Sequence, residues 1–146
     1  MSAAEPKLVV KKLVPSHTRE IAKWAGLDEA EVSDTLKSIY TSKYGAFNND
    51  ALVAILVVSK VSDLKHIVKW HHIFPHTNED VLLEGEINQK LLNKWVGDVK
   101  AGVNLEFAVS EWKTDIHLLL KSLGFRARLE RGTEEDIYVF ELVKNG

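Results

Sequence analysis

The spacing of hydrophobic residues changes several times along the chain, and each change marks a predicted element. Short valine-rich runs and alternating runs predict β-strands. Apolar residues repeated every three or four positions predict helices. The expected strands are Lys7–Val14, Tyr44–Phe47, Ala51–Ser59, His66–Phe74, Val103–Val109, Phe125–Leu129 and Ile137–Val143. Because Ala51–Ser59 is almost entirely apolar, we expect it to be covered on both faces.

Four helical patterns lie between these strands. The first begins near His17, with Ser16 or Thr18 as its cap, and ends at Gly26. Asp28 caps the second, whose inner face carries Val32, Leu36 and Ile39. The longest pattern covers residues 76–100, with Thr77 or Asn78 as cap and a stripe of Leu83, Ile87, Leu91, Trp95 and Val99. The last is Thr114–Leu123, which Gly124 ends. The predicted order is β-αα-β-β-β-α-β-α-β-β.

Composition limits the classes of function. With 146 residues and 45% hydrophobic residues, the chain is expected to form one domain over residues 1–146. A net charge of −2 argues against bulk electrostatic capture of nucleic acid or an anionic membrane. The absence of cysteine excludes disulfides, thiolate metal sites and cysteine nucleophiles. The longest apolar run, Ala51–Val58, is too short to span a bilayer, and the N-terminus lacks a secretory apolar segment. We therefore expect a cytoplasmic protein.

The C-terminal third contains a long helix leading into Gly102–Val109, then Leu123-Gly124-Phe125 after the last helix, and Asp136–Leu142 at the end. These stretches and the element order resemble the GNAT superfamily of N-acetyltransferases. The resemblance implies an α+β fold with a mixed, mostly antiparallel sheet and helices on both faces. It also implies acetyl-CoA as cofactor and an amine as acceptor.

The resemblance also places the cofactor. In the family the fourth and fifth strands separate, and the pantetheine arm of acetyl-CoA lies in the gap, here between His66–Phe74 and Val103–Val109. Phe107 and Val109 would then line the arm. The pyrophosphate would lie at the start of the long helix, near Asn78, Glu79 and Asp80, because helix N-termini bind anions.

Two positions depart from the family pattern. The segment His76–Leu82 contains no glycine and two carboxylates, where the family has a glycine-rich loop that approaches phosphates closely. Carboxylates there repel phosphate. The family's general-acid tyrosine corresponds to Leu120, which cannot donate a proton. The remaining candidates for proton transfer are His72 and His71, since histidine titrates near neutral pH.

Several alternatives stay open. Four of the six histidines lie within His66–His76, but His71 and His72 should point to opposite faces of a strand and only His66 and His72 should share one, so no metal site is expected. The chain also resembles degenerate GNAT-like proteins of tailed bacteriophages, which would make it a non-catalytic interaction protein or virion component. The first two helices resemble a helix-turn-helix, but the acidic second helix would repel phosphate, so nucleic acid is not expected as a partner. A homo-oligomer or a virion assembly, and an unknown protein partner, are further expectations, and a membrane partner is not expected.

Overall fold

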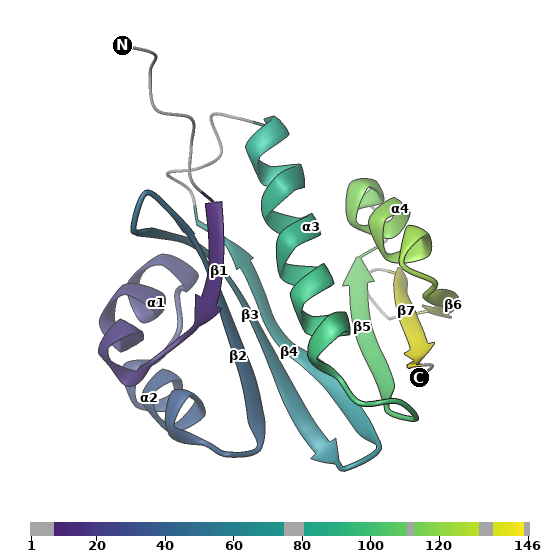
Figure 1. Cartoon of the computed structure of the whole chain (residues 1–146), viewed down its shortest axis with the longest axis horizontal. Helices are drawn as coiled ribbons and strands as arrows, with labels where there is room; N and C mark the ends of the chain where they lie inside the picture. The colour runs from purple at the N-terminus through teal and green to yellow at the C-terminus, as the bar shows by residue number, and fades with distance from the viewer. Residues whose placement is uncertain (1–7, 75–80, 111–112, 132–135, 145–146) are drawn as a thin grey trace.

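A computed structural model describes residues 8–74, 81–110, 113–131 and 136–144 of the chain. Seven strands form one sheet in the order β1-β2-β3-β4-β5-β7-β6 (Figure 1). The strands are β1 (Leu8–Lys12), β2 (Thr41–Asn48), β3 (Ala51–Ser62), β4 (Lys65–Ile73), β5 (Asn104–Ser110), β6 (Arg126–Arg131) and β7 (Asp136–Val143). All neighbouring pairs are antiparallel except β4 and β5, which are parallel. The predicted mixed, mostly antiparallel sheet is confirmed.

Helices cover both faces of this sheet. They are a short 3-10 helix (Pro15–His17), α1 (Thr18–Ala25), α2 (Glu29–Lys37), α3 (Val81–Asp98) and α4 (Thr114–Ser122). The predicted element order is therefore confirmed. Among the described residues, no helix is both long and apolar enough to cross a membrane.

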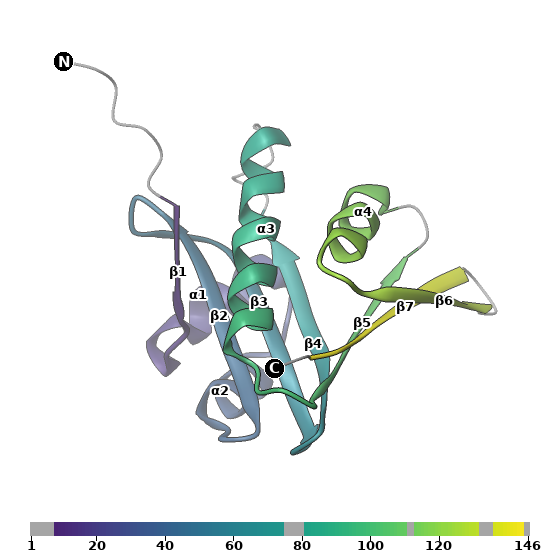
Figure 2. The ribbon, with the colours of Figure 1, turned by 45° about the vertical axis from the view of Figure 1, so that its right-hand side comes forward.

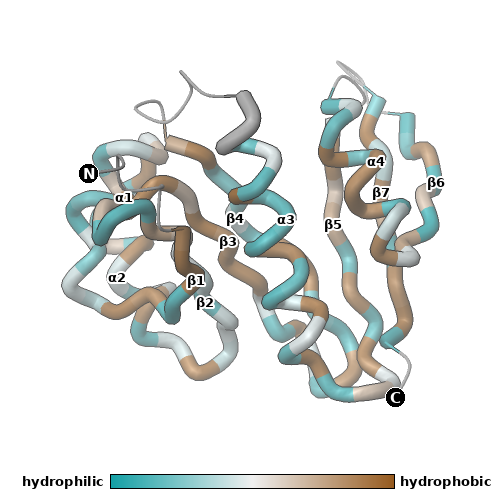
Figure 3. Tube along the Cα trace, turned by 45° about the horizontal axis from the view of Figure 1, so that its top comes forward, coloured by the Kyte–Doolittle hydropathy of each residue, from teal (hydrophilic) through white to brown (hydrophobic). Residues whose placement is uncertain are grey.

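The core has two layers that meet at β3. Leu56 and Val58 pack with α3 and α4, whereas Ile55 and Val57 pack with α1 and α2. All four side chains are completely buried, as the continuous apolar run predicted. Figure 3 shows the hydrophobic colour running along β3 in the middle of the sheet.

The α3 stripe is confirmed where the side chains are described. Ile87, Leu91 and Trp95 are fully buried, and Val99 packs at the margin of the same cluster. The proposed caps at Thr77 and Asn78 and the side chain of Leu83 lie outside the described residues. The stripe attaches α3 to the sheet and so positions one wall of the site below.

Two predictions in the N-terminal helices are corrected. Ile39 does not lie on the inner face of α2, because the helix ends at Lys37 and the backbone becomes extended at Ser38, which leaves Ile39 78% exposed. Neither Ser16 nor Thr18 caps α1, whose N-cap is His17; the Thr18 hydroxyl instead donates to the carbonyl of Pro15. Asp28 caps α2 as predicted, accepting a hydrogen bond from the Glu31 amide at 3.2 Å.

Several strand boundaries also differ from the prediction. β2 begins at Thr41 rather than Tyr44, because its pairing with β3 continues from Tyr44 to Thr41, opposite Ser59. β3 extends to Ser62 and pairs with the first residue of β4.

Candidate active site

β4 and β5 are paired over only three residues each. The register joins Lys65–Ile67 to Asn104–Glu106 and then ends. Beyond this point β4 stays paired with β3, and β5 stays paired with β7. Figure 2 shows the two strands diverging from their paired end, with α3 and α4 on either side of the opening. The facing edges of β4 and β5 are thus left without a neighbouring strand over the described residues.

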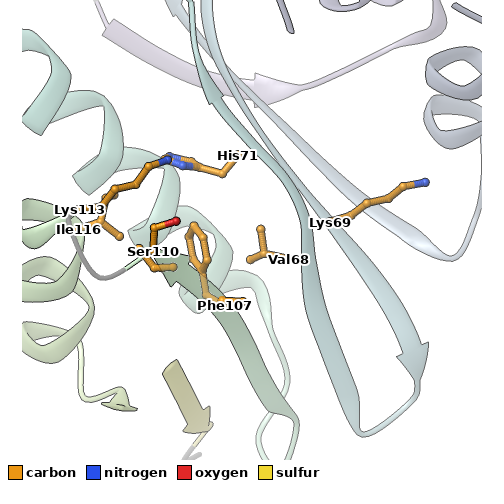
Figure 4. A pocket seen from close by; sticks show the side chains of 9 residues that line it. Val68, Lys69, His71, Phe107, Ser110, Lys113 and Ile116 are labelled. Carbon is orange, nitrogen blue, oxygen red and sulfur yellow. The ribbon is translucent and has the colours of Figure 1, made fainter. Parts of the chain in front are cut away.

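A β-bulge in β4 directs side chains into this opening. Val57 pairs with Trp70 and Val58 pairs with Val68, so Lys69 is an extra residue on β4. Lys69 points away from the opening, as Figure 4 shows, and its Nζ donates to the Thr35 hydroxyl of α2 at 2.9 Å. Val68 and His71, on either side of the bulge, consequently both face the opening.

The bulge also changes the histidine arrangement. His71 and His72 lie on opposite faces of β4, as predicted. His66 and His72, however, lie on opposite faces of β4, because the extra residue reverses the alternation between them. His66 lies on the same face as Val68, whereas His72 pairs with Ile55, which packs with α1 and α2. Among the described residues there is no group of three or more metal-ligating side chains.

Two neighbouring cavities occupy the opening. The smaller, about 160 Å³, lies between β4 and β5 and is lined by Val68, Phe107, Val109 and Ser110, among others (Figure 4). The larger, about 510 Å³, reaches α3 and α4. His71, Lys113 and Ile116 line both cavities, so the two are adjacent. The volume of the larger cavity is within the range typical of small-molecule sites.

His71 bridges three elements at the centre of the opening. Its Nε2 donates to Oδ1 of Asn88 on α3 at 2.7 Å, and its ring meets Phe107 of β5 edge-on, with centroids 5.4 Å apart. Burial lowers the pKa of His71 to about 4; the Asn88 hydrogen bond opposes this shift, while Lys113 and His72 add to it. His71 is therefore neutral at pH 7 and cannot serve as a proton donor there.

His72 borders the larger cavity next to Ile73. Burial lowers its pKa below the usual value, and the positive charge of Lys113 lowers it further. An unprotonated imidazole at neutral pH can accept a proton. Both predicted catalytic histidines are thus unprotonated at neutral pH, and they differ in that the His71 ring is held by Asn88 and Phe107.

The other predicted site residues have different outcomes. Phe107 and Val109 are buried on β5 and line the smaller cavity. Asn78, Glu79 and Asp80 lie outside the described residues. Leu120 is completely buried in the core.

Two residues of the site were missed from the sequence. Asn88 and Lys113 gave no signal, because neither lies in a recognisable motif. Glu106 lines neither cavity; it is buried on β5 and forms ion pairs with Lys65 at 3.7 Å and Arg128 at 3.5 Å. These contacts depend on pairing between distant segments.

The fold is that of the GNAT N-acetyltransferases. The ribosomal-protein-S18-alanine N-acetyltransferase from Escherichia coli is similar over 96% of each chain, with a TM-score of 0.78 and 14% identity. A probable acetyltransferase from Staphylococcus epidermidis is similar over 95% of this chain and 100% of its own, with a TM-score of 0.75 and 16% identity.

A third similar structure is Arabidopsis thaliana NAA60 in complex with a bisubstrate analogue, covering 96% of this chain and 99% of its own at a TM-score of 0.69 and 11% identity. No protein-family model matches the sequence, and no curated protein matches it by sequence. The likeness is therefore one of fold.

Proposed function

We propose that the protein is a divergent N-acyltransferase that binds acetyl-CoA in the opening between β4 and β5. The observation that carries this proposal is the end of β4–β5 pairing after three residues, next to the two cavities. The pantetheine arm is a chain containing amide groups, and such a chain can hydrogen-bond to an unpaired strand edge as an added strand does. The shared fold and the sequence resemblance support the same cofactor.

The residues of the opening fit such a ligand. The unpaired edge of β4 beyond Ile67 offers backbone donors and acceptors, while Val68, Phe107 and Val109 provide apolar walls. Acetyl-CoA would supply an acyl group activated as a thioester. Backbone N–H groups left out of the strand pairing near the bulge at Lys69 would stabilise negative charge on a carbonyl oxygen bound in the opening.

Proton transfer would depend on His72. Its neutral imidazole would accept the proton that a primary amine loses on acylation, whereas His71 would orient the site through Asn88 and Phe107. No side chain has to protonate the departing sulfur, because a thiol has a pKa of about 8.5 and leaves readily as a thiolate. The absence of a tyrosine at Leu120 is compatible with this chemistry.

The test is amine-dependent release of free thiol from acetyl-CoA, measured across a panel of primary amines. We expect slow turnover in which His72→Ala lowers kcat by about a hundredfold, the lower range for a general base. The control is His66→Ala on the same strand, away from both cavities, which should leave kcat unchanged. Turnover that is equal in wild type and His72→Ala would contradict the role of His72.

A non-catalytic GNAT-fold protein is the second candidate. The bridge of His71, Asn88 and Phe107 across the opening favours it, because an arm of acetyl-CoA must pass beside or displace this bridge. Leu120 also favours it, because this completely buried side chain corresponds to the family's general-acid tyrosine and cannot donate a proton. Such a protein would serve as an interaction component; the comparisons lend no support to a phage virion in particular. The same assay separates the candidates, because the second predicts no thiol release with any amine.

A further inference from the structure

A third cavity, of about 480 Å³, lies away from the opening, at the end of the sheet where β4 and β5 are still paired. Its walls come from β1, β2, β3 and the C-terminal part of α3. The cofactor site proposed above does not use any of these residues. Lysine side chains dominate this cavity, which we call the basic cleft; the residues used below are Lys12, Tyr44, Lys60, Lys94 and Asp98.

The strand register sets the positions of the lysines. Lys12 is directly opposite Tyr44 in the β1–β2 pair, so both side chains lie on the same face of the sheet. This is the α3 face, because the Tyr44 hydroxyl donates to Oδ2 of Asp98 on α3 at 3.2 Å. Lys60 lies two residues beyond Val58, which also packs on the α3 face. Lys94 reaches the cleft from α3 itself.

The positive charge of the cleft is only partly compensated. Asp98 is paired with Lys94 at 3.3 Å and accepts the hydrogen bond from Tyr44. Within the described chain, no carboxylate lies within 4.0 Å of the ammonium groups of Lys12 or Lys60. The charge of one carboxylate therefore faces three lysines.

The same excess positive charge affects the pKa of a neighbouring lysine, Lys43. Lys43 is directed to the other face, where its Nζ donates to the carbonyls of Leu36 at 2.8 Å and Ser38 at 2.9 Å. Burial lowers the pKa of Lys43, and repulsion from Lys12 and Lys60 lowers it further. The cleft is thus a region of positive potential with room for a small anion.

We propose that the basic cleft binds a phosphate group of an anionic ligand, with Lys12 and Lys60 as its main donors. Ammonium groups act as point charges toward phosphate and need no fixed bidentate geometry. The phosphate could belong to a small phosphorylated molecule or to a lipid headgroup. The second source is relevant because exposed apolar residues lie at the same end of the sheet, in the two connections next to it and at the end of β3: Ile39, Tyr40, Val61 and Leu64.

The experiment is a calorimetric titration with inorganic pyrophosphate at low salt. The double variant Lys12→Gln/Lys60→Gln should weaken binding at least about tenfold. The matched control, Lys90→Gln/Lys121→Gln, removes the same charge from exposed positions outside the cleft and should change binding less than about twofold. Equal weakening in both double variants would overturn the proposal, because it would show a general charge effect.

A vesicle arm separates the two sources of phosphate. Vesicles of phosphatidylcholine with about 30% phosphatidylserine are compared with pure phosphatidylcholine. Binding to the anionic vesicles that is lost in Lys12→Gln/Lys60→Gln supports a lipid headgroup, whereas pyrophosphate binding alone supports a small phosphorylated ligand. If neither probe binds in a way that depends on Lys12 and Lys60, the proposal fails. Acetyl-CoA binding in the β4–β5 opening should be unchanged in this variant, so that failure of one site is distinguishable from failure of the other.

Discussion

The buried state of His71 predicts a specific loss of stability in acid. Its pKa is about 4 in the folded protein, against a usual value of 6.5. The folded state therefore holds a neutral ring at a pH where the unfolded chain binds a proton. Protonation of His71 in the unfolded chain alone lowers the free energy of unfolding as the pH falls below 6.5, and the loss is complete below about pH 4. At about 1.4 kcal/mol per pKa unit, the full loss is about 3 kcal/mol, and the loss at pH 5 is about 2 kcal/mol.

Urea denaturation at pH 7.5 and pH 5 measures this loss. His71→Gln removes the titrating group and retains an amide that can bond to Asn88. Between pH 7.5 and pH 5 the free energy of unfolding should therefore fall in both proteins, but by about 2 kcal/mol less in His71→Gln than in the wild type. His66 and His72, whose pKa values are also lowered, remain in both proteins and cancel in the comparison. Equal acid losses in the two proteins would refute the buried, neutral state of His71.

Two other predictions concern the helices. Leu91 is completely buried on α3, so Leu91→Ala should lower the free energy of unfolding by about 2–5 kcal/mol in urea denaturation; a loss below about 0.5 kcal/mol would contradict its packing. The exposed face of α2 carries Glu29, Glu31 and Asp34, so no duplex DNA binding is expected below about 10 μM protein in gel-shift assays at about 150 mM salt. A sequence-specific shift at nanomolar protein would instead make α1 and α2 a nucleic-acid site.

Local patterns predicted much of the fold because they depend on near neighbours in sequence. The α3 stripe through Leu91 was visible as a four-residue repeat, and the ends of α1 and α4 at Gly26 and Gly124 were visible as glycine. Both glycines have positive φ, of 69° and 99°, where other residues are strained. The continuous apolar run of β3 likewise indicated burial on both faces.

The site itself was only partly predictable. His71, Phe107 and Val109 were expected on β4 and β5, but the approach of His71 to Asn88 depends on how α3 packs across the sheet. The bulge at Lys69 depends on the register between β3 and β4, which alternation in one strand does not reveal. This single extra residue reversed the predicted relation of His66 and His72. Ile39 was misplaced for a similar reason, because the end of α2 is set by Ser38 and the start of β2 rather than by apolar spacing.

The central claim is that the opening between β4 and β5 binds acetyl-CoA, and α3 offers a matched pair of glycines to test it. Gly85 lines the larger cavity, whereas Gly97 lies further along the same helix and lines neither cavity of the opening. An added Cβ meets nothing within 4 Å at either position. A side chain at either position should also favour the helix, because glycine is about 1 kcal/mol less favourable than alanine there.

The most direct measurement is calorimetric titration of acetyl-CoA into the wild type, Gly85→Trp and Gly97→Trp. We expect saturable binding to the wild type, weaker than about 100 μM, which corresponds to less than about 5.5 kcal/mol. The reason is that the carboxylates of Glu79 and Asp80, in the segment expected to meet the phosphates, would repel them. Gly85→Trp should abolish this binding by filling the cavity, and Gly97→Trp should retain it. Equal binding in both variants, or no binding to the wild type at about 10 mM acetyl-CoA, would contradict the account.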